Sequence, residues 1–130
     1  MSDLQSTNGE CMRTIIAGTR TFVDHLEILK AIENSGFEIT EVICGGAHGV
    51  DLLGESWARM KGIPIRMFLP DWKQHGKAAG PIRNSTMADN ADALILVWDG
   101  ASRGSSDMLT KATAKGLKIH VHLVKKEEKK

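Results

Sequence analysis

The sequence predicts a doubly wound α/β domain, in which a five-stranded parallel sheet of strand order 3-2-1-4-5 has helices on both faces. Short apolar runs alternate with segments whose apolar residues recur every three or four positions, the pattern of strands alternating with amphipathic helices. One run, at residues 93–98 (ALILVW), is almost continuously apolar, as in a central strand covered on both faces. Right-handed crossovers between successive parallel strands then produce three layers.

The composition fits one globular domain. With 130 residues the chain has room for a single core, and 42% hydrophobic with 25% charged residues is ordinary for a soluble protein. We expect the domain to span residues 12–124, between a flexible tail at 1–11 and a charged tail at 125–130. A net charge of +1 argues against a nucleic-acid partner, and no run suits a membrane span or a signal peptide. Two cysteines cannot form a disulfide framework. Together with the lack of a membrane span or signal peptide, this leads us to expect a cytoplasmic protein with no membrane partner.

In the first half, strands and helices are separated by glycine-containing turns. A strand at 12–17 precedes a helix that starts near Thr21 and stops at Ser35-Gly36. A second strand, at 39–44, leads to a helix at 49–61 that Gly62 ends. A third strand is expected at 63–69, because Pro64 is tolerated near a strand start.

Residues 71–87 (DWKQHGKAAGPIRNSTM) have an unusual composition and no apolar periodicity over their first ten positions. Gly80 followed by Pro81 indicates a helix start, because proline is tolerated at the first helical position. Arg83 and Asn84 would then lie in the first turn, beside unpaired backbone N–H groups that suit a phosphate or carboxylate.

The second half continues the alternation. After the central strand at 93–98, a loop rich in glycine and serine is expected at 99–106, and then a helix from Met108 to Gly116. The last strand, at 117–124, alternates apolar residues with lysine and histidine, as an edge strand does when one face is wet.

The candidate site lies at the loops after strands one, two and four. In a doubly wound sheet, ligands bind beyond the carboxyl ends of the strands, where the winding reverses. All three loops are rich in glycine, and the first and third also carry arginine and hydroxyl side chains that suit a phosphate. The loop after strand two also offers Asp51 to sugar hydroxyls or to its own helix turn.

Simpler interpretations of these loops stay open. Thr21 could be an ordinary N-cap after strand one, and Ser105 or Ser106 could cap the helix after strand four. Neither the G-x-G-x-x-G dinucleotide fingerprint nor a Walker loop is present, so no cofactor is expected. His120 and His122 share one strand face but have no third ligand nearby, so we expect no metal.

These residues resemble the YspA-type family of the SLOG superfamily, which includes the DNA-processing protein DprA (Smf) and the LONELY GUY phosphoribohydrolases. The resemblance covers most of residues 13–124, and its motifs follow the chain order. They are Gly18-Thr19-Arg20, Gly45-Gly46-Ala47-x-Gly49-x-Asp51, Asp71-Trp72 with Gly76-Lys77-x-Ala79-Gly80-Pro81-x-Arg83-Asn84, and Gly104-Ser105-x-Asp107-Met108.

The resemblance implies a single Rossmann-like domain with a pocket for a nucleotide or nucleotide-derived ligand. It also implies a homo-oligomer, a dimer or a tetramer. Trp72 or Trp98 could contact the base. The candidate ligand- and phosphate-binding residues are Gly18, Thr19, Arg20, Gly45, Gly46, Gly49, Asp51, Trp72, Lys77, Arg83, Asn84, Gly100, Arg103, Gly104, Ser105 and Ser106.

Catalysis is the weaker expectation, because one part of the LONELY GUY signature is altered. Arg83 and Met87 match its R-K-x-x-M piece, with Asn84 in place of lysine. In the P-G-G-x-G-T-x-x-E piece the glutamate position falls on Met108, and Asp107 is the only nearby carboxylate. We therefore expect a ligand-binding protein. The alternatives are a nucleoside 5′-monophosphate phosphoribohydrolase with Arg83 and Asp107 as catalytic residues, or a DprA-like binder of single-stranded DNA.

Overall fold

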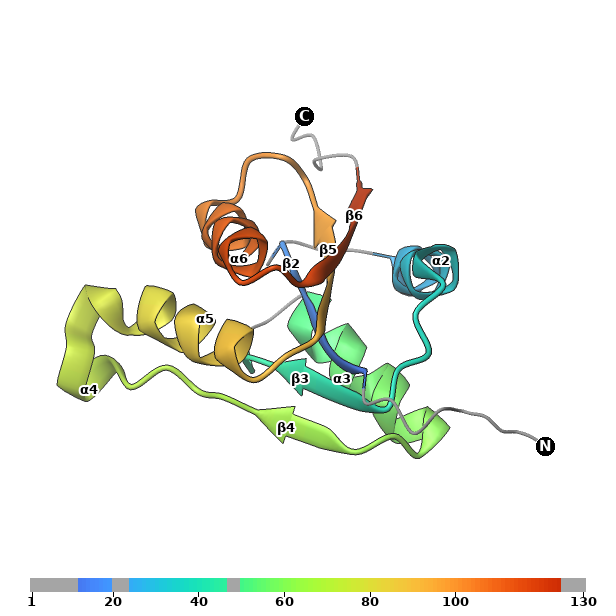
Figure 1. Cartoon of the computed structure of the whole chain (residues 1–130), viewed down its shortest axis with the longest axis horizontal. Coiled ribbons are helices and arrows are strands. Elements are labelled where there is room, and N and C mark those ends of the chain that lie inside the picture. The colour runs from blue at the N-terminus through green and yellow to red at the C-terminus, as the bar shows by residue number, and fades with distance from the viewer. Residues whose placement is uncertain (1–11, 20–23, 47–49, 125–130) are drawn as a thin grey trace.

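A computed structural model describes residues 12–19, 24–46 and 50–124, which form one five-stranded parallel sheet of order β4-β3-β2-β5-β6 (Figure 1). This is the predicted order 3-2-1-4-5. The predicted tails at 1–11 and 125–130, and the candidate residues Arg20 and Gly49, lie outside the described residues. The strands are β2 (Arg13–Gly18), β3 (Glu41–Cys44), β4 (Ile65–Met67), β5 (Ala93–Trp98) and β6 (Lys118–Leu123).

The sheet is built around β2 and β5, which pair along five residue positions from Thr14↔Ala93 to Gly18↔Val97. The first five residues of β5 are buried, which confirms the central strand expected from its continuous apolar run. The edge strand β6 instead shows only partly buried and exposed residues. The winding reverses between β2 and β5, so their carboxyl ends mark the switch point.

Helices cover both faces of the sheet (Figure 1). Successive residues of the central strands point to opposite faces, so Ile16 and Ile95 enter one core and Ile15 and Leu94 enter the other. The first core includes residues of α2 (His25–Ser35) and α3 (Val50–Lys61), and the second includes residues of α5 (Ala79–Asp89) and α6 (Arg103–Ala114). Within the described residues, no helix has the length and apolarity needed to cross a membrane.

The predicted third strand, 63–69, is longer than the observed β4. Backbone bonds flank β4 on both sides, from Val42 N to the Pro64 carbonyl at 2.9 Å and from Phe68 N to the Cys44 carbonyl at 2.9 Å. Pairing with β3 ends there, because Leu69 and Pro70 lead the chain away from the sheet edge and Pro70 has no N–H to donate.

Three helix starts differ from the prediction. Asp24 caps α2 by accepting a bond from Leu26 N at 3.0 Å; the predicted start at Thr21 lies outside the described residues. The helix expected at Gly80-Pro81 begins at Ala79, after α4 (Trp72–His75) and the 3-10 turn η1 (Gly76–Ala78). Arg83 and Asn84 are consequently the fifth and sixth residues of α5 and lie in its second turn.

The third difference is at α6, which begins at Arg103 and so contains the second half of the predicted loop 99–106. One oxygen of the Asp99 carboxylate accepts bonds from the N–H groups of Ala101 at 2.9 Å and Ser102 at 3.0 Å. These bonds fold residues 99–102 into a tight turn, so that the helix starts at the next residue.

Candidate functional site

A cavity of about 300 Å³ lies at the carboxyl end of β2, between the N-terminal parts of α5 and α6. It sits at the switch point, where the sequence placed the site. The end of β2 and the helices α3, α5 and α6 meet there. Its lining residues are Ala17, Gly18, Asp51, Arg83, Asn84, Met87, Ser102, Arg103, Gly104, Ser105 and Met108.

Arg83 reaches from α5 across to the loop after β3. Its Nη1 donates to the Gly45 carbonyl at 2.6 Å, and its Nε donates to Oδ1 of the neighbouring Asn84 at 3.0 Å. A Cβ at Gly45 would lie 2.1 Å from Arg83 Nη1 and 3.1 Å from Asp51 Oδ2, so the guanidinium and the carboxylate lie close together here. Only glycine at position 45 leaves room for this arrangement.

Asp51 is a buried carboxylate, 6% exposed, that lines the cavity from the first turn of α3. Its Oδ2 accepts a bond from Gly45 N at 3.2 Å. The same side chain is therefore anchored to the loop after β3 and is open to the cavity.

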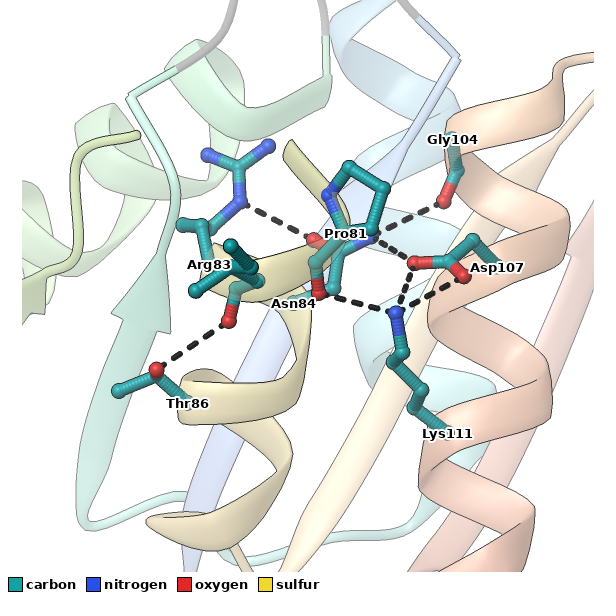
Figure 2. Close-up of polar contacts among 8 residues, drawn as sticks. Pro81, Arg83, Asn84, Thr86, Gly104, Asp107 and Lys111 are labelled. Atoms are coloured by element: carbon teal, nitrogen blue, oxygen red, sulfur yellow. Dashed lines mark hydrogen bonds and ion pairs between the residues drawn. The ribbon is translucent and has the colours of Figure 1, made fainter. Parts of the chain in front are cut away.

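Asn84 joins α5 to α6 through a polar chain of three side chains (Figure 2). Its Nδ2 donates to Asp107 Oδ2 at 2.9 Å and to the Gly104 carbonyl at 3.3 Å. Lys111 Nζ donates to both oxygens of Asp107, at 2.9 and 2.8 Å, and to the Pro81 carbonyl at 2.9 Å. Asp107 therefore forms part of the link between the helices, and it does not line the cavity.

The N-terminus of α6 forms the opposite wall of the cavity. Its N-cap residue, Ser102, makes no side-chain capping bond; its hydroxyl donates instead to Ser105 Oγ at 3.2 Å. The first N–H groups of a helix have no intrahelical acceptor, so those of Arg103, Gly104 and Ser105 face the site without a side-chain cap. Within the described part of the chain, the exposed Arg103 guanidinium has no hydrogen-bond or ion-pair partner.

Asp99 and Thr19 brace this wall from behind. The N–H groups of Ala101 and Ser102, with the Thr19 hydroxyl at 3.2 Å, hold the pKa of the Asp99 carboxyl below its ordinary value. Thr19 is buried and its N–H bonds to the Val97 carbonyl at 3.0 Å, so it supports the site without lining it. The Thr19 hydroxyl donates to the Asp99 carboxylate, whereas the sequence predicted that it would bind a phosphate.

Several candidate residues lie away from the cavity lining. Trp72 is 53% exposed on α4, and Lys77 is exposed on η1. Trp98 is partly buried and its indole N–H donates to the Ser102 carbonyl at 3.1 Å, so it packs behind the α6 start. The remaining candidates outside the lining are Gly45, Gly46, Gly100 and Ser106.

Ala17, Met87, Ser102 and Met108 line the cavity but were not among the candidate site residues. Ala17 and Met87 are core residues by their pattern, so no sequence signal marks them. Met108 is 1% exposed and occupies the position at which the LONELY GUY signature has glutamate. Among the lining residues that the structure describes, Asp51 is the only carboxylate.

A second cavity of about 320 Å³ adjoins the first, and Arg83 borders both. It lies between the segment that leaves β4 and the α4–α5 region. Its walls combine apolar side chains, including Phe68, Leu69 and Ile82, with polar groups from Asp71, His75, Arg83 and Thr86.

The two histidines of β6 do not form a metal site with other described residues. His122 Nε2 lies 2.7 Å from Glu27 Oε1 and joins β6 to α2. Within residues 12–19, 24–46 and 50–124, no group of three or more histidine, cysteine, aspartate or glutamate side chains could hold a metal ion.

Comparisons with known proteins agree with this architecture. Residues 12–75 match the model of the YspA, cpYpsA-related SLOG family. The Gene 61 protein of Mycobacterium phage D29 is 29% identical over 117 residues, which cover 82% of this chain and 93% of that protein. The crystal structure of DNA processing protein A (DprA) from Streptococcus pneumoniae superposes with a TM-score of 0.67 at 15% identity. That match covers 85% of this chain but only 50% of DprA, and it shows a shared fold alone.

Proposed function

Because residues 12–75 match the model of the YspA-related SLOG family, we propose that the chain binds a nucleotide or nucleotide-derived ligand through a phosphate group, in the cavity between α5 and α6. The observation that carries this proposal is the N-terminus of α6. It faces a cavity of about 300 Å³ with no side-chain cap, and Arg103 stands at its first position. That volume is at the lower end of the range for ligand pockets, about 300–1,000 Å³.

The phosphate would be held mainly by α6. The helix dipole and the N–H groups of its first turn attract an anion, and no acidic residue in that turn opposes one. The Arg103 guanidinium adds charge-assisted bonds from the same side. Arg83 faces the phosphate from α5 and contributes positive charge, while its bonds to Gly45 and Asn84 keep it in place.

The rest of the ligand would lie toward the other walls. Asp51 offers carboxylate oxygens to sugar hydroxyls at the far side of the cavity. The apolar side chains among the walls of the second cavity, including Phe68 and Ile82, suit the face of a base that extends past Arg83.

We propose binding without hydrolysis. Cleavage of an N-glycosidic bond needs a group that activates water or stabilises positive charge on the sugar, and the Met108 thioether does neither. Asp107 is engaged by Asn84 and Lys111 and lies outside the cavity lining. A DprA-like role in binding single-stranded DNA receives no support beyond the shared fold.

The test is calorimetric titration of the protein with AMP, GMP, CMP, UMP and inorganic phosphate, with chromatography of the same mixtures for free base. We expect at least one nucleotide to bind and no base to appear. Arg103→Gln removes charge-assisted bonds worth about 1.5–3 kcal/mol, so that nucleotide should bind about tenfold more weakly or worse, at an unchanged melting temperature. Arg83→Gln should lower both affinity and melting temperature, because Arg83 also holds the Gly45 loop.

Arg59→Gln is the matched control, because Arg59 is an exposed arginine of α3 that pairs with Glu55. It should leave affinity unchanged. Failure of every nucleotide to bind, or equal affinity in Arg103→Gln, would contradict the proposal. Sustained release of base would favour the hydrolase, and tight, salt-sensitive binding of an oligonucleotide in a gel shift would favour the DNA-binding alternative. We also propose the homo-oligomer that the family resemblance implies, which sedimentation equilibrium tests.

A further inference from the structure

The polar chain Lys111–Asp107–Asn84–Arg83 links the two helices that form the cavity (Figure 2). Only Arg83 and Asn84 line the cavity, so the other two members have no contact role in the proposed function. The hydrogen-bond geometry of the polar chain gives Asp107 and Lys111 a different role.

The amide of Asn84 is oriented by its partners. On one side is Arg83 Nε, which can only donate; on the other are the Asp107 carboxylate and the Gly104 carbonyl, which accept. A rotated amide would place its NH₂ against a donor and its oxygen against two acceptors. Asn84 is buried, 7% exposed, so water cannot readily replace the lost bonds.

Asp107 is held in turn by Lys111, four residues later on α6. The ammonium group contacts both carboxylate oxygens and also the Pro81 carbonyl in the first turn of α5. This position fixes the carboxylate between the helices, where Oδ2 accepts simultaneously from Asn84 and Lys111.

We propose that Asp107 and Lys111 are positioning residues of the anion site, which orient the Asn84 amide and through it the Arg83 guanidinium. The consequence for ligand affinity rests on the proposed function; the orientation of Arg83 does not. Asn84 and Gly45 hold the guanidinium at two nitrogens, Nε and Nη1, which together fix its plane. Without Asp107, the NH₂ group of Asn84 keeps only the longer bond to Gly104, so the amide that accepts from Arg83 Nε is held less firmly.

The first test is NMR of the free protein, following exchange of the arginine Nε–H signals with water. The Arg83 signal is identified by its loss in Arg83→Lys, and the Arg13 signal serves as an internal reference because Arg13 Nε bonds to Asp92 at 3.0 Å elsewhere in the fold. Asp107→Ala and Lys111→Met should accelerate exchange at Arg83 about fivefold or more, a rise of the size expected from coupled neighbours. Exchange at Arg13 should not change.

Asp89→Ala is the matched control, since it removes the exposed pair between Asp89 of α5 and Lys115 at the end of α6. This variant breaks a contact between the same two helices but leaves the polar chain intact. It should therefore leave exchange of the Arg83 Nε–H unchanged. Unchanged Arg83 exchange in Asp107→Ala, even with a lower melting temperature, would show that Asp107 is merely structural and would overturn the proposal.

The second test is a double-mutant cycle with AMP as the titrated probe. Asp107→Ala should weaken AMP binding about three- to tenfold in the natural background and less than about twofold in Arg83→Lys, because positioning is lost when its target changes. Equal losses in both backgrounds would overturn the proposal. If the natural protein binds neither AMP nor another nucleotide, the proposed function fails, and the NMR measurement alone decides the orientation of Arg83.

Discussion

At Gly18, the end of β2 passes so close to β5 that no side chain fits between them. A Cβ at this position would lie 1.9 Å from the Val97 carbonyl oxygen and 3.0 Å from a methyl carbon of Val50. The obstacle is backbone in a central strand, which cannot move aside as the end of a flexible side chain can. Gly18 also lines the cavity at the carboxyl end of β2.

Gly18→Ala should therefore destabilise the protein severely, by about 3 kcal/mol or more, since the overpacking falls on backbone. Urea denaturation followed by circular dichroism measures the change. Gly104→Ala is the control, because a Cβ there meets nothing within 4 Å and the position is helical; we expect it to stabilise by about 0.5–1 kcal/mol. Equal unfolding free energies in the two variants would contradict this explanation.

The two arginines that line the cavity differ in their hydrogen-bond partners, and the sequence alone does not predict this difference. Arg83 lies three residues after Gly80, and Arg103 directly precedes Gly104. Both are predicted from the sequence to bind a phosphate. In the structure Arg83 is bonded to the Gly45 carbonyl, 38 positions earlier in the chain, whereas Arg103 has no partner among the described residues. A contact between such distant residues depends on how β3 and α5 pack, which the local pattern does not contain.

At the scale of elements, the sequence predicted the sheet better than the helix starts. The β5 run and the helix periodicities are local signals, and with the handedness rule they led to the correct strand order. The short helix α4 has a local signal of its own. Asp71 stands three residues before Gln74, and its carboxylate accepts from Gln74 N at 3.1 Å. The start of α6 depends on Asp99 bonding to the following N–H groups, and serine-rich loops give no comparable signal.

The candidate site followed from topology more than from motif. The switch-point rule placed it at the ends of β2 and β5, and the cavity is there. The rule could not tell which loop residues point inward. Thr19 therefore turned out to brace Asp99, and Gly46 to pack against Leu69, where a Cβ would lie 2.5 Å from a leucine methyl carbon.

Asp92 is the residue that ties three strands together at the opposite end of the sheet. Its side chain accepts from Arg13 N and Nε, at 2.9 and 3.0 Å, its N–H donates to the Arg13 carbonyl, and its carbonyl accepts from Lys118 N. The side-chain bond from Arg13 holds the pKa of the Asp92 carboxyl below its ordinary value of 3.8, against the opposing effect of burial. It thus aligns β2, β5 and β6 before their pairing begins.

Asp92→Asn should lower the unfolding free energy by about 1 kcal/mol at pH 7, an amount reduced by the partial exposure of the pair. Because the pKa is lower in the folded state, the ionised Asp92 stabilises the protein above pH 3.8, and this stability is lost as pH falls through the folded-state value. Unfolding free energies from pH 7 down to pH 2 should therefore converge for the two proteins below about pH 4. A difference that stays constant over this range would contradict the assignment.

Among the residues that the structure describes, burial is greatest at the centre of the sheet and falls toward the β4 edge. β5 is paired on both sides and buried over five of its six residues, whereas β4 has three residues, none of them buried. Likewise, no residue of α4 or η1 is buried. The first cavity borders the well-buried centre of the sheet at Ala17 and Gly18, and the second borders the exposed segment around Leu69.

Hydrogen exchange followed by mass spectrometry should reproduce this gradient in the free protein. Amides of β2 and β5 are expected to exchange only on global unfolding, because both strands are bonded on two sides and lie between the two cores. Peptides covering β4, α4 and η1 should exchange first, through local opening that leaves the central strands paired. Denaturant should accelerate the slow class far more than the fast class, since only global unfolding exposes much surface. If β4 were protected as long as β5, the edge would unfold only with the core, and the two cavities would have to be treated as one rigid site.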